Sequence, residues 1–194
     1  MILCLCRYLP EAGVFGEEHG RHGNQDLVWI IDPIDGTTNF LSGLDNFSIS
    51  VALVKEGKPV LGVVYKPATN ESFQAVSGNG FYHNEVKTQE LSETLPLSRA
   101  LIGTGFPYRS KDLQDMFFPC AREVLKSSRG IRRMGSAALD LCYVAAGYLQ
   151  GFWESDLQPY DVAAGLLFLE ETGMRVSNQY GEVYDMFNDR ILIC

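Results

Sequence analysis

A run of five apolar residues, 27–31 (Leu-Val-Trp-Ile-Ile), leads directly into Asp32-Pro33-Ile34-Asp35-Gly36. A continuous apolar run of this length is typical of a strand that is buried on both faces of a sheet. Pro33 disfavours a helical backbone at Asp32 and therefore keeps Asp32 extended at the end of that strand. A tight turn after the strand would bring the side chains of Asp32 and Asp35 to one side. The sequence thus predicts a buried sheet whose strand end presents two carboxylates.

The remaining patterns predict a layered α/β domain, of the α+β kind, with antiparallel strands in its middle. Alternation of apolar and polar residues predicts strands at 47–55 and 60–65, joined by a turn at 56–59, and further strands at 71–76 and 80–83. Helical spacing covers 113–126, 136–149 and 161–171, with Ser136 as an N-cap and Gly173 as a C-terminal cap. Residues 2–8 are typical of the last turns of a helix and 190–194 of a buried strand. We expect one compact unit with two lobes that meet near residue 95.

The charge balance excludes some partners. Asp and Glu number 24 against 16 Lys and Arg, which gives a formal net charge of −8. Such a chain repels nucleic acid and anionic lipid, and no apolar run approaches the roughly 18 residues of a membrane span. The five cysteines are scattered and form no metal-binding or disulfide pattern, which favours reduced thiols. We therefore expect a cytoplasmic protein with no nucleic-acid or membrane partner.

Acidic residues gather in three places: Glu17-Glu18, Asp32 with Asp35, and Asp161 at the head of an apolar helical pattern. Each has an ordinary alternative: an exposed surface pair, a solvated turn and a helix N-terminal carboxylate, respectively. If the carboxylates converge, however, they repel one another and take up protons unless cations neutralise them. Oxygen ligands without a Cys or His cluster select a hard ion such as Mg²⁺, with Mn²⁺ as an alternative.

Three motifs together resemble those of the inositol monophosphatase family of magnesium-dependent, lithium-sensitive sugar phosphatases. They are residues 16–18 (Gly-Glu-Glu), 29–40 (Trp-Ile-Ile-Asp-Pro-Ile-Asp-Gly-Thr-Thr-Asn-Phe) and 160–165 (Tyr-Asp-Val-Ala-Ala-Gly). The likeness extends to residues 62–65 and 132–138. It implies an αβαβα sandwich, with a metal-binding lobe at 1–95 and a substrate lobe at 96–194 that carries a second sheet and the Asp161 helix. Compared with the family, we expect the chain to lack the N-terminal helices and the C-terminal end of the fold.

The resemblance also implies the metal ligands. Glu17, Asp32 and the backbone carbonyl of Ile34 would hold one Mg²⁺, and Asp32, Asp35 and Asp161 a second. Glu17 would reach a third, weaker ion through water. Two or three ions are therefore expected.

By the same resemblance, the backbone N–H groups of Gly36 and Thr37 would bind the phosphate, and Thr37 with Glu17 would orient the attacking water. Glu18 would have a lesser role. The residues implied to line the substrate pocket are Glu154, Arg132, Gly135, Ser136 and Ala137. Two of these assignments have plain alternatives: Arg132 with Arg133 as a solvated basic pair, and residues 135–138 as a helix start made of small residues.

The family likeness implies magnesium-dependent hydrolysis of a small polyol or sugar phosphomonoester by water, with inositol monophosphate as the first candidate and a homodimer as the assembly. Histidinol phosphate, fructose bisphosphate and 3′-phosphoadenosine 5′-phosphate remain alternative substrates. A different class of function also stays open, in which the chain is a catalytically impaired or truncated family member that acts as a protein-interaction partner.

Overall fold

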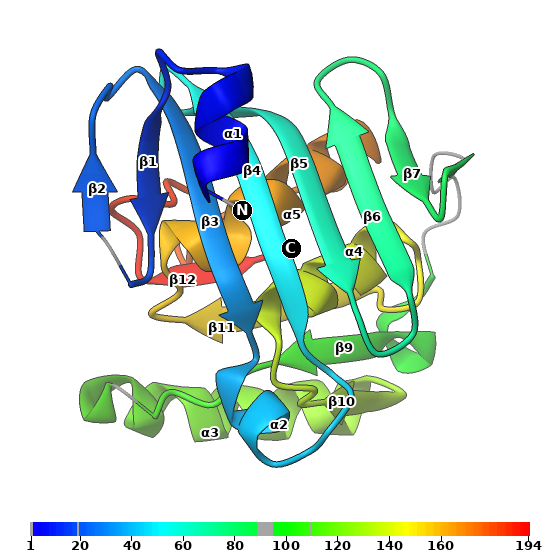
Figure 1. Ribbon diagram of the computed structural model, residues 1–194. Helices are drawn as coiled ribbons and strands as arrows, with labels where there is room; N and C mark the ends of the chain where they lie inside the picture. The colour runs from blue at the N-terminus through cyan, green and yellow to red at the C-terminus, as the bar shows by residue number, and fades with distance from the viewer. Residues whose placement is uncertain (1, 19, 89–94, 109) are drawn as a thin grey trace.

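The computed structural model describes residues 2–18, 20–88, 95–108 and 110–194, and within them the strands form two sheets (Figure 1). The larger sheet has the order β2-β1-β3-β4-β5-β6-β7-β8. Its strands are β1 (Gly13–Gly16), β2 (Gly20–His22), β3 (Leu27–Asp35), β4 (Ser48–Lys55), β5 (Lys58–Lys66), β6 (Glu71–Val76), β7 (Phe81–His83) and β8 (Val86–Lys87). Neighbouring strands are antiparallel except β1 and β3, which are parallel.

The smaller sheet has the order β10-β9-β11-β12. Its strands are β9 (Leu101–Thr104), β10 (Gly130–Arg132), β11 (Gly151–Ser155) and β12 (Ile191–Ile193). β9 runs parallel to both β10 and β11, and β12 is antiparallel to β11. The sheet is therefore assembled from short strands of the second half of the chain.

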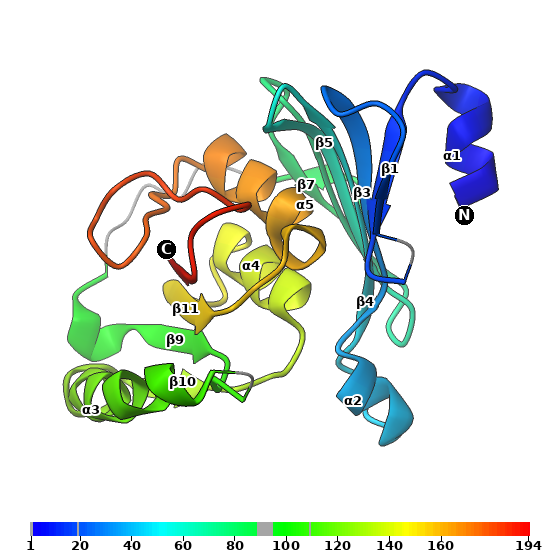
Figure 2. The same cartoon turned by 90° about the vertical axis from the view of Figure 1, so that its left-hand side faces the viewer.

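The helices complete a five-layer sandwich, which confirms the αβαβα arrangement (Figure 2). They are α1 (Ile2–Tyr8), α2 (Thr37–Leu41), α3 (Lys111–Ser127), α4 (Ala137–Ala145) and α5 (Pro159–Glu171), with a 3₁₀ turn at Leu97–Arg99. The pair α4 and α5 lies between the two sheets, α1 lies on the other face of the larger sheet, and α3 lies outside the smaller one. No helix in the described ranges is long and apolar enough to cross a membrane.

The core is centred on α4 and α5, which are buried between layers. All nine residues of α4 are buried, and apart from Asp140 their largely apolar character suits a helix with protein around it. Gly165 of α5 allows the two helices to approach closely, because a Cβ there would lie 2.6 Å from the Leu141 Cβ of α4. One hydrophobic cluster joins residues from both sides of residue 95, including Phe73 of β6 and Phe168 of α5. The division into two lobes stays a prediction.

The structure corrects the expected turn after residue 31. Strand β3 continues through Asp32 to Asp35, and its pairing with β4 shifts register between these two residues. The backbone N–H of Ile34 donates to Asp32 Oδ1 at 2.9 Å, so the side chain satisfies a group that the strand ladder leaves unpaired. A bulge of this kind re-aims side chains at the end of a strand. The two carboxylates are thus brought together inside an irregular strand.

Helix boundaries were predicted to within a few residues, with one exception. The helix expected at 136–149 ends at Ala145. Ser136 does cap it, since its hydroxyl accepts from the N–H of Leu139 at 3.4 Å. Pro159 extends α5 by two residues beyond its expected start at Asp161, because proline fits the first helical turn without losing a hydrogen bond. Gly173 follows α5 with a positive φ of 73°, as the expected C-terminal cap requires.

Candidate active site

Three carboxylates that are distant in the sequence meet at one end of the larger sheet. Asp32 and Asp35 come from the bulged end of β3, and Asp161 comes from the first turn of α5. Each offers a carboxylate oxygen, and these oxygens lie within 4.8 Å of one another. Asp32 and Asp35 are buried, and Asp161 is half-buried. The predicted convergence of these three residues is therefore confirmed.

Backbone and side-chain donors fix the orientation of two of the carboxylates. Asp35 Oδ2 accepts hydrogen bonds from the hydroxyl of Ser136 and from the N–H of Ala138, which is 2.9 Å away. Asp161 Oδ2 accepts from the N–H of Gln158 at 2.7 Å, and the Gln158 side chain caps the same helix in return. Because Ser136 and Ala138 belong to the start of α4, that helix holds Asp35 just as α5 holds Asp161.

The crowding of these acids opposes their ionisation. Burial, followed by the negative charge of Asp35, raises the pKa of Asp32 to about 7. Burial likewise raises the pKa of Asp35 to about 6, although its hydrogen bond with Ser136 acts in the opposite direction. Burial and the charge of Asp35 hold the pKa of Asp161 well above its ordinary value. A divalent cation would offset the cost of burying charged carboxylates and the repulsion between them. An all-oxygen donor set suits Mg²⁺. The residues present therefore fit a magnesium site.

This electrostatic arrangement predicts how the stability of the metal-free protein depends on pH. Folding raises the pKa of Asp32 from 3.8 to about 7, so between about pH 4 and pH 7 the folded state binds more protons than the unfolded state. The free energy of unfolding therefore decreases as the pH rises through this window. In a chelator, we expect the melting temperature to fall by roughly 5 °C or more between about pH 5 and about pH 8. Excess Mg²⁺ should remove most of that fall, as scanning calorimetry would measure. A melting temperature that rises with pH in the chelator would contradict this account of the site.

A cavity of about 560 Å³ opens beside the carboxylate cluster. Asp35 and Asp161 form part of its lining, and Glu154 of β11 lines it as well. Gly105 makes room for Glu154, because a Cβ at position 105 would overlap the Glu154 carboxylate. Of the other residues expected in the substrate pocket, Gly135 and Ala137 line the cavity. Ser136 is not among the lining residues and instead holds Asp35.

The structure does not bring Arg132 to this cavity. Arg132 is exposed on β10, and its Nη1 donates to the carbonyl of Ile131 at 3.0 Å. Its neighbour Arg133 lines the cavity, where its guanidinium lies 5.3 Å from the ring centre of Tyr108 and 6.0 Å from that of Phe106. Consecutive side chains of an extended segment point in opposite directions, so only one of the two arginines can face the site. The expected pocket residue was Arg132, whereas the arginine that lines this cavity is Arg133.

The other expected site residues are not part of the group of clustered carboxylates, and Glu17 and Glu18 line a separate pocket with Leu3 and Pro33. Glu17 and Glu18 are exposed in the turn after β1, and the Glu17 charge contributes to the raised pKa values of Asp32 and Asp35. The Thr37 hydroxyl donates to the Ile34 carbonyl at 2.9 Å. Their roles toward metal, water and phosphate stay predictions.

Gly36, whose phosphate-binding role also stays a prediction, starts α2 with a φ of 85°, in the left-handed region that favours glycine. A Cβ at position 36 would lie only 3.0 Å from the Asn46 carbonyl and 3.1 Å from the Gly135 carbonyl. A side chain here would therefore push α2 away from the segment that precedes α4.

Two buried polar residues near the site were missed. Asn39 in α2 donates through Nδ2 to the carbonyls of Asn46 (2.7 Å) and Met134 (2.8 Å), which joins α2 to the segment before α4. Asp140 in α4 is 1% exposed, and its Oδ1 has no hydrogen-bond partner among the described residues. Burial, and next the charge of Glu154, holds its pKa well above the ordinary value. The sequence feature that could have identified Asp140 is an acidic residue inside an otherwise apolar helical pattern.

Comparison with known proteins agrees with this geometry. The sequence model described as the inositol monophosphatase family matches residues 4–194. An inositol-1-monophosphatase from Rhizobium meliloti (strain 1021) is 45% identical over 171 residues, which cover 87% of this chain and 64% of that protein. A Nus factor SuhB from Pasteurella multocida (strain Pm70) is 41% identical over 166 residues, 84% of this chain and 62% of that protein. The chain thus spans somewhat less than two thirds of the length of these curated relatives.

Solved structures show the same fold. The structure of an inositol monophosphatase from Anabaena (Nostoc) sp. PCC 7120 superimposes with a TM-score of 0.92 at 36% identity, covering 99% of this chain and 77% of that one. The match extends over both sheets and therefore over β3 and α5, which carry the three clustered carboxylates. With the sequence model, the fold and the acidic cluster in agreement, the chain belongs to the inositol monophosphatase family.

Proposed function

We propose that this chain carries the catalytic centre of a magnesium-dependent phosphomonoester hydrolase that acts on a small polyol or sugar phosphate, inositol monophosphate first. The observation that carries the proposal is the convergence of Asp32, Asp35 and Asp161 beside a cavity of about 560 Å³. A cavity of this volume lies in the range of small-molecule sites. Phosphomonoesters hydrolyse extremely slowly without a catalyst, so charge neutralisation and positioning are the main tasks of such a site.

The residues of the cluster fit the expected metal ligands. Asp32, Asp35 and Asp161, with Glu17 and the Ile34 carbonyl, would hold two or three Mg²⁺ ions, with Mn²⁺ as an alternative. Bound divalent cations supply Lewis acidity and neutralise the negative charge of a phosphate ester. The raised pKa values of Asp32 and Asp35 support this assignment, because the protein carries an electrostatic penalty there that cations would relieve.

The remaining residues would position the reactants. The Thr37 hydroxyl donates its proton to the Ile34 carbonyl, so its oxygen can accept a hydrogen bond from the attacking water, which Glu17 would orient as well. The N–H groups of Gly36 and Thr37 would bind the phosphate. Glu154 would accept hydrogen bonds from hydroxyl groups of the leaving alcohol, and Arg133 lines the same cavity.

The names of related proteins support a phosphomonoester as substrate. One related structure is titled as an inositol monophosphate complex of SaIMPase-II and another as a 2′AMP complex, at 31% and 32% identity. We therefore propose inositol monophosphate as the first substrate to test. Histidinol phosphate, fructose bisphosphate and 3′-phosphoadenosine 5′-phosphate are alternatives. A cytoplasmic homodimer is the proposed working form.

A role as a protein-interaction partner is the second candidate. It is favoured by relatives named Nus factor SuhB, which match this chain about as well as those named inositol-1-monophosphatase. The retained cluster of Asp32, Asp35 and Asp161 supports the enzyme, because a pure interaction partner has no need of a buried group of like charges whose ionisation costs free energy.

The proposed function is tested by phosphate release. Incubated with inositol monophosphate and Mg²⁺, the purified chain should release inorganic phosphate, and a chelator or Li⁺ should inhibit the reaction. A parallel panel of the three alternative substrates and 2′-AMP identifies the preferred leaving group from the ratio of kcat/KM values. If no phosphomonoester in the panel is hydrolysed while Mg²⁺ still raises the melting temperature, the hydrolase proposal is wrong and the metal site remains.

A further inference from the structure

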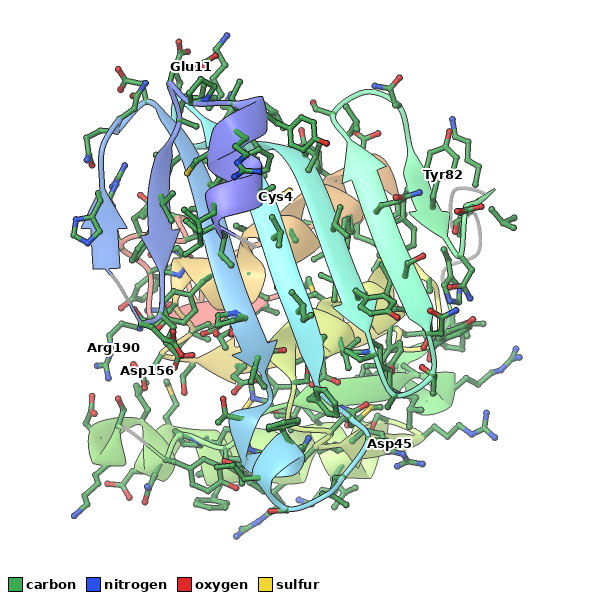
Figure 3. The ribbon with its side chains drawn as sticks, in the orientation of Figure 1. Cys4, Glu11, Asp45, Tyr82, Asp156 and Arg190 are labelled. Atoms are coloured by element: carbon green, nitrogen blue, oxygen red, sulfur yellow. The ribbon has the colours of Figure 1, made fainter. Side chains whose placement is uncertain are left out.

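Arg190, which directly precedes β12, joins two segments that lie far apart in the sequence. Its Nη1 donates to Asp112 Oδ2 at 2.8 Å, its Nη2 to Ser110 Oγ at 2.9 Å, and its Nε to Asp156 Oδ1 at 3.1 Å. The backbone also joins Arg190 to Asp156, since the N–H of Asp156 donates to the Arg190 carbonyl at 2.7 Å. Figure 3 shows Arg190 and Asp156 next to each other. We call Ser110, Asp112, Asp156 and Arg190 the Arg190 clamp.

One side of the clamp holds a wall of the candidate active-site cavity. Asp156 lines this cavity together with its neighbours Ser155 and Leu157. The segment lies between Glu154, which lines the same cavity, and Asp161 of the carboxylate cluster. Asp156 has a φ of 59°, an uncommon conformation for a residue other than glycine, so outside contacts are needed to maintain it.

The other side of the clamp reaches a different part of the wall through α3. Ser110 and Asp112 stand at the start of α3, and residues 106–108 of the cavity lining precede them. Gln114 of α3 donates through Nε2 to the Pro107 carbonyl at 3.1 Å. Phe106 contacts Phe117 of α3 edge-to-face, with ring centres 5.6 Å apart. The position of α3 therefore determines the position of residues 106–108.

Packing alone fixes α3 poorly. Phe117 is its buried residue, and an apolar cavity of about 460 Å³ separates part of the helix from the smaller sheet. This second cavity is lined by Leu113 and Val124 on the helix and by Phe152 and Ile191 on the sheet, among others. Side chains that border a cavity lose the dispersion contacts that would otherwise set the position of a helix. The clamp thus fixes the position of the start of α3, which packing against the smaller sheet does not fix.

We propose that Arg190 is a positioning residue of the candidate active site. By joining residues 155–157 to the start of α3, and through α3 to residues 106–108, it sets the width of the cavity in which the leaving alcohol would bind. Arg190 is 49% exposed and Asp112 64% exposed, so their ion pair adds little to the free energy of unfolding. The Asp156 side chain is only 17% exposed, so its ion pair with Arg190 also supports the local stability of residues 155–157. This inference rests on the proposed function.

The test compares the full chain with R190Q, and with D112A, which removes the exposed ion pair on the α3 side of the clamp and leaves the Ser110 hydrogen bond. For inositol monophosphate at saturating Mg²⁺, R190Q should raise KM about tenfold and D112A less, with kcat changed by less than about twofold. R190K should not restore KM, because a lysine cannot make the three divergent contacts of the guanidinium. The Mg²⁺ concentration for half-maximal activity should change less than KM, because the backbone N–H of Gln158 holds Asp161 and only the Gln158 side chain contacts the clamp, through the Asp156 carbonyl at 3.4 Å.

K126Q is the matched control, because Lys126 forms an ion pair with Glu123 on the same helix and lies outside both cavities. Hydrogen–deuterium exchange gives a measurement that does not depend on activity. In R190Q, peptides that contain residues 106–108 and 155–157 should both exchange faster than in K126Q. An unchanged KM together with unchanged exchange would overturn the inference, as would a KM increase of the same size in K126Q. If the parent chain hydrolyses no phosphomonoester, the proposed function fails, and the exchange result alone then decides whether the clamp holds both walls.

Discussion

Asp32→Asn is expected to lower kcat by about 10³-fold or more while the fold persists. Asp32 contributes a charged oxygen to the cluster with Asp35 and Asp161, and the amide oxygen of asparagine is a much weaker ligand for a hard cation. The expected stability change has the opposite sign. At neutral pH and in a chelator, the variant should melt at the same temperature as the parent or higher, because a buried like charge has been removed. Rate assays and calorimetry on the same preparation would measure both effects.

Asp45→Asn is the matched control for this experiment. Asp45 is an exposed aspartate in the loop after α2, and its replacement by asparagine changes the net charge equally. It should leave kcat unchanged. If Asp32→Asn stays folded and keeps the parent rate, the assignment of Asp32 as a metal ligand is wrong.

Gly165→Val should cause the largest loss of stability, about 3 kcal/mol in the free energy of unfolding. Gly165 lies where α5 faces α4, and a Cβ there would lie 2.5 Å from Leu141 Cδ1 and 2.6 Å from Leu141 Cβ. The Cβ of Leu141 cannot move without its helix, so the two helices must separate. For a chain of this size we expect the melting temperature to fall by roughly 6–12 °C.

The same substitution should also weaken the metal site. Helix α4 holds Asp35 through Ser136 and Ala138, and α5 carries Asp161, so separating the helices moves the carboxylates apart. The stabilisation by Mg²⁺ should therefore shrink in Gly165→Val. Gly130→Ala is the control, because a Cβ at position 130 meets its nearest atom at an ordinary 3.5 Å. Equal effects of the two substitutions would show that the close helix contact is unimportant.

Local patterns predicted the long elements of this fold well. Strands β4, β5 and β6 show alternation, helix α3 shows helical spacing and α5 is a long apolar run closed by Gly173, and their observed bounds differ from the expected ones by at most a few residues. Strands β1, β2, β8, β9, β10 and β11 were not predicted, because each is only two to five residues long and too short to show a clear period. Such strands form because a neighbouring strand offers hydrogen-bond partners, which is a tertiary condition.

The candidate site, too, was predicted from the sequence only in part. Asp32, Asp35 and Asp161 were identified from their motifs, and Ser136 was identified as a helix cap. The hydrogen bond from Ser136 to Asp35 was not predicted, since it joins residues from different layers. The choice of Arg133 over Arg132 depended on which face of an extended segment looks toward the cavity.

By itself, the sequence of this protein determined where the long helices and strands lie, and which acidic side chains stand at the ends of those elements. These properties depend on neighbouring residues, whose steric and hydrogen-bonding preferences act over a few positions. Only the tertiary structure decided that α4 and α5 pack between two sheets and so bring Asp161 to Asp32 and Asp35, and that Arg190 bridges two walls of one cavity. Such contacts depend on how layers stack, because burial of apolar surface is not directional and constrains distant side chains only after the whole core has formed.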